Sequence, residues 1–324
     1  MTVYRYRLIP KSSIATPLRS DTLCGHLLCA ARELDGDTVL GEILERFRAD
    51  EPPFVLSSAF PSGYLPMPIL PSLMRNDTRE LVKALPQFKG SLFHLLEELK
   101  KFRKNKWVPV TSWQSLSTNL SFKALFLDCL QGKAGSQNKQ KGNENNTKIV
   151  PEIHNSINRN TGRVLEGGLY TTETTFYGQG NYLDLYAETD EADSLERYLS
   201  HVAATGFGKD RALGKGFFKW ERDDTFAPGD LFGRGDHSMN LSVFSAKDLS
   251  SVSGTYEVFT KYGKVWNGFG ENNPFKRPFL AFREGSVFTS YPLQGSSLTD
   301  IHSNPSIIHC TVPLMIRFNM TGAA

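Results

Sequence analysis

Residues 206–216 form a glycine-rich, basic segment, GFGKDRALGKG. Glycines let a backbone approach a ligand closely and offer its N–H groups, while Lys209, Arg211 and Lys215 outnumber the single acid, Asp210. This chemistry suits the phosphodiester backbone of a nucleic acid. The spacing fits neither a Walker A loop nor a dinucleotide-binding fingerprint. A plain connection between a helix and a strand is the alternative interpretation of the same residues.

A second cluster, HNSINRNTGR, spans residues 154–163. Its amides, its hydroxyl and its two arginines, Arg159 and Arg163, have the chemistry to contact phosphates and base edges of single-stranded RNA. Tyr170, a few residues further on, can stack on a base. A surface turn that carries two arginines is the alternative interpretation.

Two titratable residues raise the question of catalysis. His26 lies in the first expected helix, and a histidine near a scissile phosphate serves as general acid or base in metal-independent RNA cleavage. A partly buried helix residue or a simple phosphate contact is the alternative role. Asp21 stands at the start of the same helix, within Ser-Asp-Thr, a pattern typical of an N-cap.

The composition matches a globular protein, with 40% hydrophobic and 22% charged residues among 324, enough for two domains. No apolar run is long enough to span a membrane, and arginines near the N-terminus disfavour a signal peptide, so we expect a cytoplasmic protein. Four separate cysteines and seven scattered histidines lack the spacing of a metal site, and we expect no cofactor. A net charge of +3 permits an anionic partner.

The elements that would position these residues follow a βαββαβ order, which is the plan of a ferredoxin-like or RNA-recognition-motif-like α+β fold. Hydrophobic periodicity and helix-capping residues predict strands over 2–10, 54–60, 183–189 and 217–221, and helices over 21–34 and 193–205. Gly36 is expected to stop the first helix, and a second amphipathic helix follows over 39–47. The glycine-rich segment then connects the last helix to the last strand.

A long insertion interrupts this plan between the second and third strands. Within it, residues 132–148 contain one apolar side chain and predict a flexible loop, and residues 164–177 predict a projecting, thumb-like hairpin. We therefore expect a first domain over 1–222 and a second α+β or β-rich domain over 223–324. A further helix over 91–102 ends in a run of lysines and arginines, which indicates either a solvated helix end or part of a nucleic-acid surface.

Taken together, the motifs resemble one family of the RAMP superfamily: the subunit that caps the 5′ handle of the guide RNA (crRNA) in type III-A (Csm) CRISPR-Cas effector complexes. The glycine-rich loop is common to the superfamily, whereas its combination with the other motifs points to this subunit. The matching stretches, which run from residue 20 to 288, are SDTLCGHLLCAARE, PPFVLSSAFPSGYLPMPILP, HNSINRNTGRVLEGGLY, TGFGKDRALGKGFF and RPFLAFREGSVF.

The resemblance implies a non-catalytic RNA-binding subunit in antiviral defence. Such a subunit holds the repeat-derived 5′ handle, links the large signalling subunit to the backbone RAMP subunits, and places its thumb near target RNA. The RNA contacts that it implies here are Gly206, Phe207, Gly208, Lys209, Arg211, Lys215, Asn155, Ser156 and Arg159. To these we add Arg163, Arg19 and Ser20 for proximity, Tyr170 for stacking, and His26 for a phosphate contact.

Two alternatives stay open at this stage. Some relatives in the superfamily are ribonucleases, so the chain is alternatively a metal-independent CRISPR-repeat endoribonuclease that uses His26. The target-cleaving backbone subunits use an aspartate near the first helix, the neighbourhood of Asp21. A standalone RNA-recognition protein of another family would also suit the expected fold and its basic loops.

Overall fold

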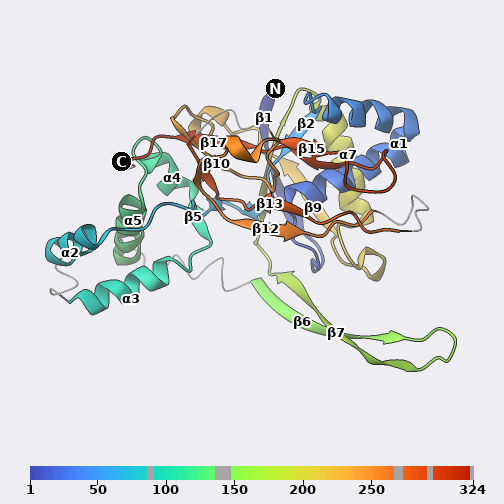
Figure 1. The fold of residues 1–324 in the computed structure, drawn as a ribbon, viewed down its shortest axis with the longest axis horizontal. Helices are drawn as coiled ribbons and strands as arrows, with labels where there is room; N and C mark the ends of the chain where they lie inside the picture. The colour runs from blue at the N-terminus through green and yellow to red at the C-terminus, as the bar shows by residue number, and fades with distance from the viewer. Residues whose placement is uncertain (86–90, 136–146, 266–272, 290–294, 322–324) are drawn as a thin grey trace.

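The computed structural model describes residues 1–85, 91–135, 147–265, 273–289 and 295–321. It has a mixed α+β architecture: a main antiparallel sheet, several small sheets, a helical lobe and a long hairpin that projects from the body (Figure 1). None of the helices in these ranges is long and apolar enough to span a membrane.

The elements up to the hairpin are β1 (Thr2–Pro10), α1 (Ser20–Arg48), β2 (Phe54–Leu56), β3 (Phe60–Pro61), β4 (Tyr64–Pro66), α2 (Arg75–Ala84), α3 (Leu92–Phe102), β5 (Trp107–Pro109), α4 (Val110–Leu116), α5 (Phe122–Gly135), β6 (Thr147–Ile157) and β7 (Val164–Tyr177). They are followed by β8 (Leu183–Thr189), α7 (Ala192–Thr205), β9 (Phe218–Arg222), β10 (His237–Asn240), β11 (Gly254–Thr255), β12 (Val258–Lys261), β13 (Phe279–Phe282), β14 (Val287–Phe288), β15 (Ser296–Leu298), β16 (His309–Thr311) and β17 (Met315–Phe318). Short 3-10 helices span Arg211–Leu213, Pro228–Asp230 and Leu249–Ser251.

The main sheet has the strand order β2-β8-β1-β9, and every neighbouring pair is antiparallel. The short strand β3 also pairs with β8, antiparallel to it. Side chains of β8 alternate between its two faces, as a pleated strand requires. Leu183, Leu185 and Ala187 belong to a core cluster with α1 and α7, whereas Tyr186 belongs to a second cluster. The sheet is therefore covered on both faces, by α1 and α7 on one and by later strands and the helical lobe on the other.

Helix α1 contains the break that its sequence predicts. Gly36 has φ +89° and ψ 177°, a non-helical conformation that a side chain would strain, so α1 consists of two helical segments across a kink. The strand predicted over 54–60 is also divided. Ser57 still donates its N–H to the carbonyl of Tyr186 in β8, but Ser58 donates to Leu241 of a later segment, and pairing with β8 resumes only at Phe60.

The hairpin is longer than its sequence predicts. Residues 164–177 form only one of its strands, β7, which pairs with β6 from Thr147↔Tyr177 to Ile157↔Val164. The expected flexible loop over 132–148 is correspondingly shorter, since 132–135 end α5 and 147–148 begin β6, while 136–146 lie outside the described residues. The polar composition of 132–148 conceals both the end of α5 and the start of β6. The start of β6 is ordered by backbone pairing with β7 rather than by apolar side chains.

Helices α2 to α5 form a lobe beside the strand pair β4–β5. Leu95, Leu99 and Phe102 of α3 are buried against Phe126 of α5 in the second core cluster. This cluster also contains Met239 and other residues of β10 and β17, so the lobe shares one core with the C-terminal strands.

Asp21 is not the cap that its local sequence indicates. Arg19 occupies the N-cap position of α1, and no side chain caps there. The Asp21 side chain is fully buried, its Oδ2 lying 2.8 Å from Lys261 Nζ and 3.1 Å from His309 Nε2. Burial alone would raise the pKa of Asp21, but the hydrogen bond from His309 and the charge of Lys261 outweigh it and hold that pKa well below its usual value. Asp21 thus joins α1 to β12 and β16.

We predict that Asp21→Asn lowers the free energy of unfolding by about 3 kcal/mol at neutral pH, because Lys261 is left without its buried counter-charge. The folded pKa of Asp21 is depressed, so this contribution is present above about pH 4 and is lost as the pH falls below that value. Urea denaturation at several pH values measures it. Asp300→Asn, which breaks an exposed ion pair with Arg277, is the matched control and should cost less than about 1 kcal/mol. Equal losses in the two variants would contradict the prediction.

Candidate nucleic-acid interface

The glycine-rich loop is closed by its own backbone. Phe207 donates its N–H to the carbonyl of Gly216 at 2.9 Å, and Gly216 donates to the carbonyl of Ser13 at 2.8 Å. Gly216 has φ +79°, and a Cβ there would lie 2.0 Å from the carbonyl oxygen of Phe207. The close approach therefore requires glycine at this position. It buries the ring of Phe207 completely beneath the loop.

The loop sits between two other segments of the chain. Lys209 donates its N–H to Thr16 Oγ1 at 2.9 Å, and Gly208 leaves no room for a Cβ, which would lie 2.5 Å from Thr16 Cβ. On the other side of the same segment, Ile14 and Thr175 exchange two backbone hydrogen bonds of 2.9 Å. Residues 11–16 thus connect the glycine-rich loop directly to β7, at the base of the hairpin.

Lys215 fastens the loop to the hairpin. Its ammonium group pairs with Glu152 of β6 and donates to Thr174 Oγ1 of β7 at 3.1 Å, and its side chain is only 12% exposed. The hydrogen bond with Glu152 raises the pKa of Lys215 and lowers the pKa of Glu152. The charge of Lys215 is therefore already used within the protein, so the structure does not support the predicted role of Lys215 as a direct phosphate contact.

Lys209 is exposed and lies over the inner face of the hairpin. Its ammonium nitrogen is 5.3 Å from the ring centroid of Tyr170, and that ring stacks on His154 at 5.3 Å with an interplanar angle of 17°. His154 is held by Thr172 Oγ1 at 2.9 Å from its Nε2. A cation above a fixed aromatic pair suits a phosphate and an adjacent base.

His26 supports the loop from below. Its Nε2 accepts the N–H of Gly208 at 3.1 Å, and its ring lies 4.7 Å from the ring of Phe207. Burial, together with the nearby charge of Arg211, lowers the pKa of His26 to about 4. The imidazole is therefore neutral at neutral pH, with its proton on Nδ1 and its Nε2 lone pair occupied by the backbone.

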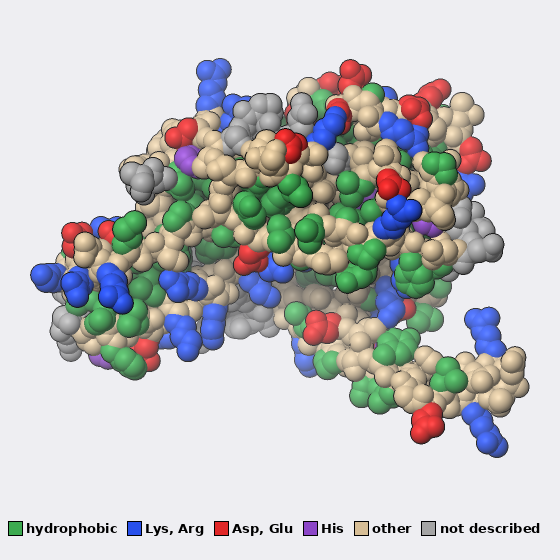
Figure 2. Space-filling model, in the orientation of Figure 1, with side chains coloured by type: hydrophobic (Ala, Val, Ile, Leu, Met, Phe, Trp, Pro, Cys, Tyr) green, Lys and Arg blue, Asp and Glu red, His purple; other side chains and the backbone are tan. Residues whose placement is uncertain are grey.

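The remaining hairpin residues of the predicted site lie further out. Asn155 and Ser156 follow His154 on β6, and Arg159 and Arg163 are exposed in the turn between the strands. Because each residue of a β-strand advances roughly 3.3 Å, the turn lies roughly 20 Å from Tyr170 along the hairpin. Figure 2 shows Lys and Arg side chains at this far end of the hairpin. The structure therefore separates a hairpin-tip group from a group at the glycine-rich loop.

Arg19 and Ser20 do not join either group. The guanidinium of Arg19 lies 4.7 Å above the ring of Phe259, with Glu284 at 3.9 Å. Ser20 is buried, and its hydroxyl accepts the N–H of Val243 at 2.8 Å. The structure does not support Ser20 as an RNA contact, because the hydroxyl serves to attach α1 to the segment after β10.

Sequence reasoning missed three residues that hold the two motifs together, namely Thr16, Glu152 and Thr174, and it gave no specific role to His154 at the start of the second cluster. Thr16 lies outside every motif, and Glu152 and Thr174 are ordinary strand residues. Only the period-two pattern of β6, with Glu152 and His154 on the same face, signals that they act together.

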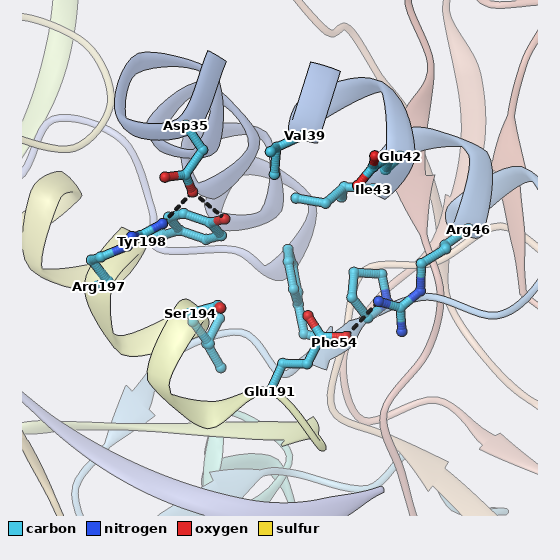
Figure 3. A pocket seen from close by; sticks show the side chains of 12 residues that line it. Asp35, Val39, Glu42, Ile43, Arg46, Phe54, Glu191, Ser194, Arg197 and Tyr198 are labelled. Atoms are coloured by element: carbon cyan, nitrogen blue, oxygen red, sulfur yellow. Dashed lines mark hydrogen bonds and ion pairs between the residues drawn. The ribbon is translucent and has the colours of Figure 1, made fainter. Parts of the chain in front are cut away.

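A separate cavity of about 240 Å³ lies between the second half of α1, the start of α7 and β2 (Figure 3). Its walls include Ile43 and Phe54, and an ion pair between Arg46 and Glu191 crosses its edge. Its volume is below the roughly 300 Å³ of the smallest typical ligand sites, and it contains none of the predicted site residues. Across the described ranges, no group of three or more His, Cys, Asp or Glu side chains is placed to hold a metal ion.

Comparison with known proteins identifies the fold. No family model matches the chain, and no curated protein is significantly similar in sequence. A chain of the crystal structure of the Csm1–Csm4 cassette in complex with cA4 matches with a TM-score of 0.57 at 15% identity, over 99% of this chain and all of that one. A chain of the Csm3–Csm4 subcomplex of the type III-A CRISPR-Cas interference complex matches with a TM-score of 0.55 at 16% identity, over 98% and 99%.

The chain therefore shares its fold with chains of the Csm1–Csm4 and Csm3–Csm4 structures. Csm4 is the component that the two matching structures have in common, and the likeness extends from end to end of the chain. The chain thus has a Csm4-like fold, in agreement with the family that its motifs resemble.

We predict unequal effects for two alanine substitutions in the loop. The Cβ that Gly214→Ala adds has no atom within 4 Å, so this variant should lose only about 1 kcal/mol of the free energy of unfolding, from the strain of an alanine at φ +89°. Gly216→Ala, with φ +79°, meets the backbone of Phe207 and should cost several times more, because the loop has to open. Urea denaturation of both variants measures the difference. Equal costs would show that the close approach does not hold the loop.

Proposed function

We propose that this protein is a non-catalytic crRNA-binding subunit of a type III-A (Csm) interference complex and caps the repeat-derived 5′ handle of the guide RNA. The observation that carries the proposal is the end-to-end structural match to the component shared by the Csm1–Csm4 and Csm3–Csm4 structures. The glycine-rich loop supports it, because its exposed Lys209 and its backbone stand beside an aromatic pair on the hairpin. In this proposal the handle crosses the loop and the inner face of the hairpin.

The hairpin acts as the thumb in this proposal, with target RNA near its outer face. That face carries a row of exposed apolar side chains among polar ones: Ile153 is 72% and Leu169 is 68% exposed, and Ile149 and Ile157 continue the row. Exposed apolar side chains that no described residue covers suit insertion between stacked bases. Arg159 and Arg163 at the turn then reach phosphates beyond the inserted side chains.

The partners follow from the same comparison. We propose that the chain contacts a large signalling subunit of the Csm1 kind and a backbone RAMP subunit of the Csm3 kind, because the matching structures pair Csm4 with these two proteins. We also propose that β1, α1, β2, β8, α7 and β9 form a ferredoxin-like unit within residues 1–222, with the C-terminal domain after it. Their antiparallel order β2-β8-β1-β9 supports this assignment.

The geometry disfavours the alternative, a metal-independent CRISPR-repeat endoribonuclease. His26 is the candidate general acid or base, but its Nε2 accepts the N–H of Gly208 and its pKa is lowered to about 4. It therefore has no proton to give from Nε2 at neutral pH, and its lone pair is occupied. Asp21 is equally unsuited, since it is buried between Lys261 and His309.

The first test is purification of the tagged protein from its native host, with sequencing of the RNA that accompanies it. We expect short RNAs with one repeat-derived 5′ end, together with a large subunit and several RAMP subunits. Lys209→Ala with Arg211→Ala should reduce the RNA retained and lower the salt dependence of binding by about 1.4 in the log–log slope. Lys219→Ala with Arg234→Ala removes the same charge outside the loop and serves as the control. A protein that comes alone and cuts repeat RNA would refute the proposal.

His26→Gln separates the structural role of His26 from a catalytic one, since the glutamine amide oxygen replaces the Nε2 acceptor without titrating. The folded pKa of His26 is lowered to about 4, so its contribution to stability is present above pH 6.5 and is lost as the pH falls towards 4. Between pH 6.5 and pH 4, we expect the free energy of unfolding to fall by about 3 kcal/mol less in the variant than in the wild type, as measured by urea denaturation. RNA association should be retained. Repeat-RNA cleavage by the wild type that His26→Gln abolishes would favour the endoribonuclease instead.

A further inference from the structure

The helical lobe carries more positive charge than the protein as a whole. Residues 67–135 contain 11 Lys and Arg and 5 Asp and Glu, a net charge of +6, whereas the complete chain has +3. The rest of the chain is therefore net negative. A lobe with this imbalance is an electrostatic feature in its own right, separate from the glycine-rich loop.

The cations concentrate at the C-terminal end of α3 and the start of β5. Lys100 is in the last turn of α3, Lys104 and Lys106 follow the helix, and all three are exposed. Arg103 lies over the ring of Phe122 at 5.9 Å, which brings Lys123 of α5 to the same end of the lobe. We call the group Lys100, Arg103, Lys104, Lys106 and Lys123 the α3 basic surface.

Helix-end electrostatics account for only part of this surface. Lysines in the last turn of a helix are favoured by its dipole, and Lys101 also pairs with Glu98. The dipole effect falls off within one turn, so it explains neither Lys106 nor Lys123. No hydrogen bond or ion pair reaches the ammonium groups of Lys100, Lys104 or Lys106 from any residue that the structure describes. Their charges are free to meet an anion.

The character of the surface favours a nucleic acid over a protein. Protein interfaces are depleted of lysine at their centres and enriched in apolar and aromatic side chains. On α3 the exposed apolar side chains, Leu92, Phe93 and Leu96, lie in the first half of the helix, with Leu96 one turn before Lys100. The cations continue past the end of the helix to Lys106, and an exposed, lysine-rich surface is what a phosphodiester backbone binds, with counterion release as the driving force.

The position of the surface is compatible with a long RNA. In Figure 1, α3 and the hairpin both lie below the body, and the C-terminal end of α3 is directed towards the body rather than away from it. Figure 2 shows Lys and Arg side chains on the underside of the lobe in the same view. An RNA that leaves the hairpin along this side would meet the lobe.

We propose that the α3 basic surface is a second, sequence-independent binding site for the phosphate backbone of single-stranded RNA, separate from the glycine-rich loop. It binds through Lys100, Lys104 and Lys106, with Arg103 and Lys123 beside them. The proposal shares with the proposed function only the premise that this chain binds RNA. It concerns different residues on a different lobe.

The test is binding of the full chain to a labelled, mixed-sequence single-stranded RNA over a series of KCl concentrations. Lys100→Gln, Lys104→Gln and Lys106→Gln together should lower the slope of log affinity against log salt by about 2, at roughly 0.7 per phosphate contact. The matched control is Arg75→Gln, Arg79→Gln and Lys83→Gln on α2, three exposed cations of the same lobe. It should leave the slope close to that of the wild type. Thermal melting should be unchanged in both variants.

The outcomes are distinct. An unchanged slope in the α3 variant, or equal decreases in the α3 and α2 variants, would overturn the proposal. Loss of a co-purifying protein with RNA binding intact would overturn it in favour of a protein docking surface. The variant Lys209→Ala with Arg211→Ala keeps the two proposals apart: RNA binding that depends on α3 but not on the loop contradicts the proposed function, and the reverse contradicts the α3 site.

Discussion

The close approach of Gly216 to the backbone of Phe207 is the constraint on which the candidate interface depends. It closes the loop, buries the Phe207 ring against His26, and leaves the Gly208 N–H directed at His26 Nε2. The loop can then lie against Thr16, which fixes where Lys209 leaves the surface. One backbone contact, possible only without a side chain, thereby positions the cation of the interface relative to the hairpin.

The cations of the loop have different roles although the sequence presents them alike. Lys215 is nearly covered, and its charge is balanced by Glu152, so it contributes to the attachment of the hairpin. Lys209 lies above the ring of Tyr170, no acidic side chain that the structure describes pairs with it, and it stays open to an anion. A buried, paired ammonium group cannot also neutralise a phosphate without leaving its carboxylate uncompensated. A loop of this kind therefore offers less positive charge to RNA than its composition indicates.

The local patterns predicted the elements well, because helix caps, breaks and periodicity are determined within a few residues. The helix expected over 193–205 is Ala192–Thr205, and Gly36 breaks α1 as expected. Contacts between distant segments were not predictable in this way. Asp21 has the sequence context of a cap, yet its partners are Lys261 and His309, which only the folded chain brings near. Likewise, 164–177 alternates clearly, whereas its partner strand follows a polar stretch that conceals its beginning.

The hairpin is attached to the body at its base and exposed along the rest of its length. A two-stranded ribbon is only marginally stable by itself in water. Here contacts of Ile14, Glu152 and Thr174 attach its base to the body, whereas its outer face carries exposed apolar side chains such as Ile153 and Leu169. No residue that the structure describes covers these two side chains, and an exposed apolar surface of this kind is typical of a binding surface. The anchored base sets the direction of the ribbon, and its outer half is stabilised by whatever covers that apolar face. Under the proposed function, RNA that covers this face also stabilises the hairpin, so that binding and ordering of the hairpin are coupled.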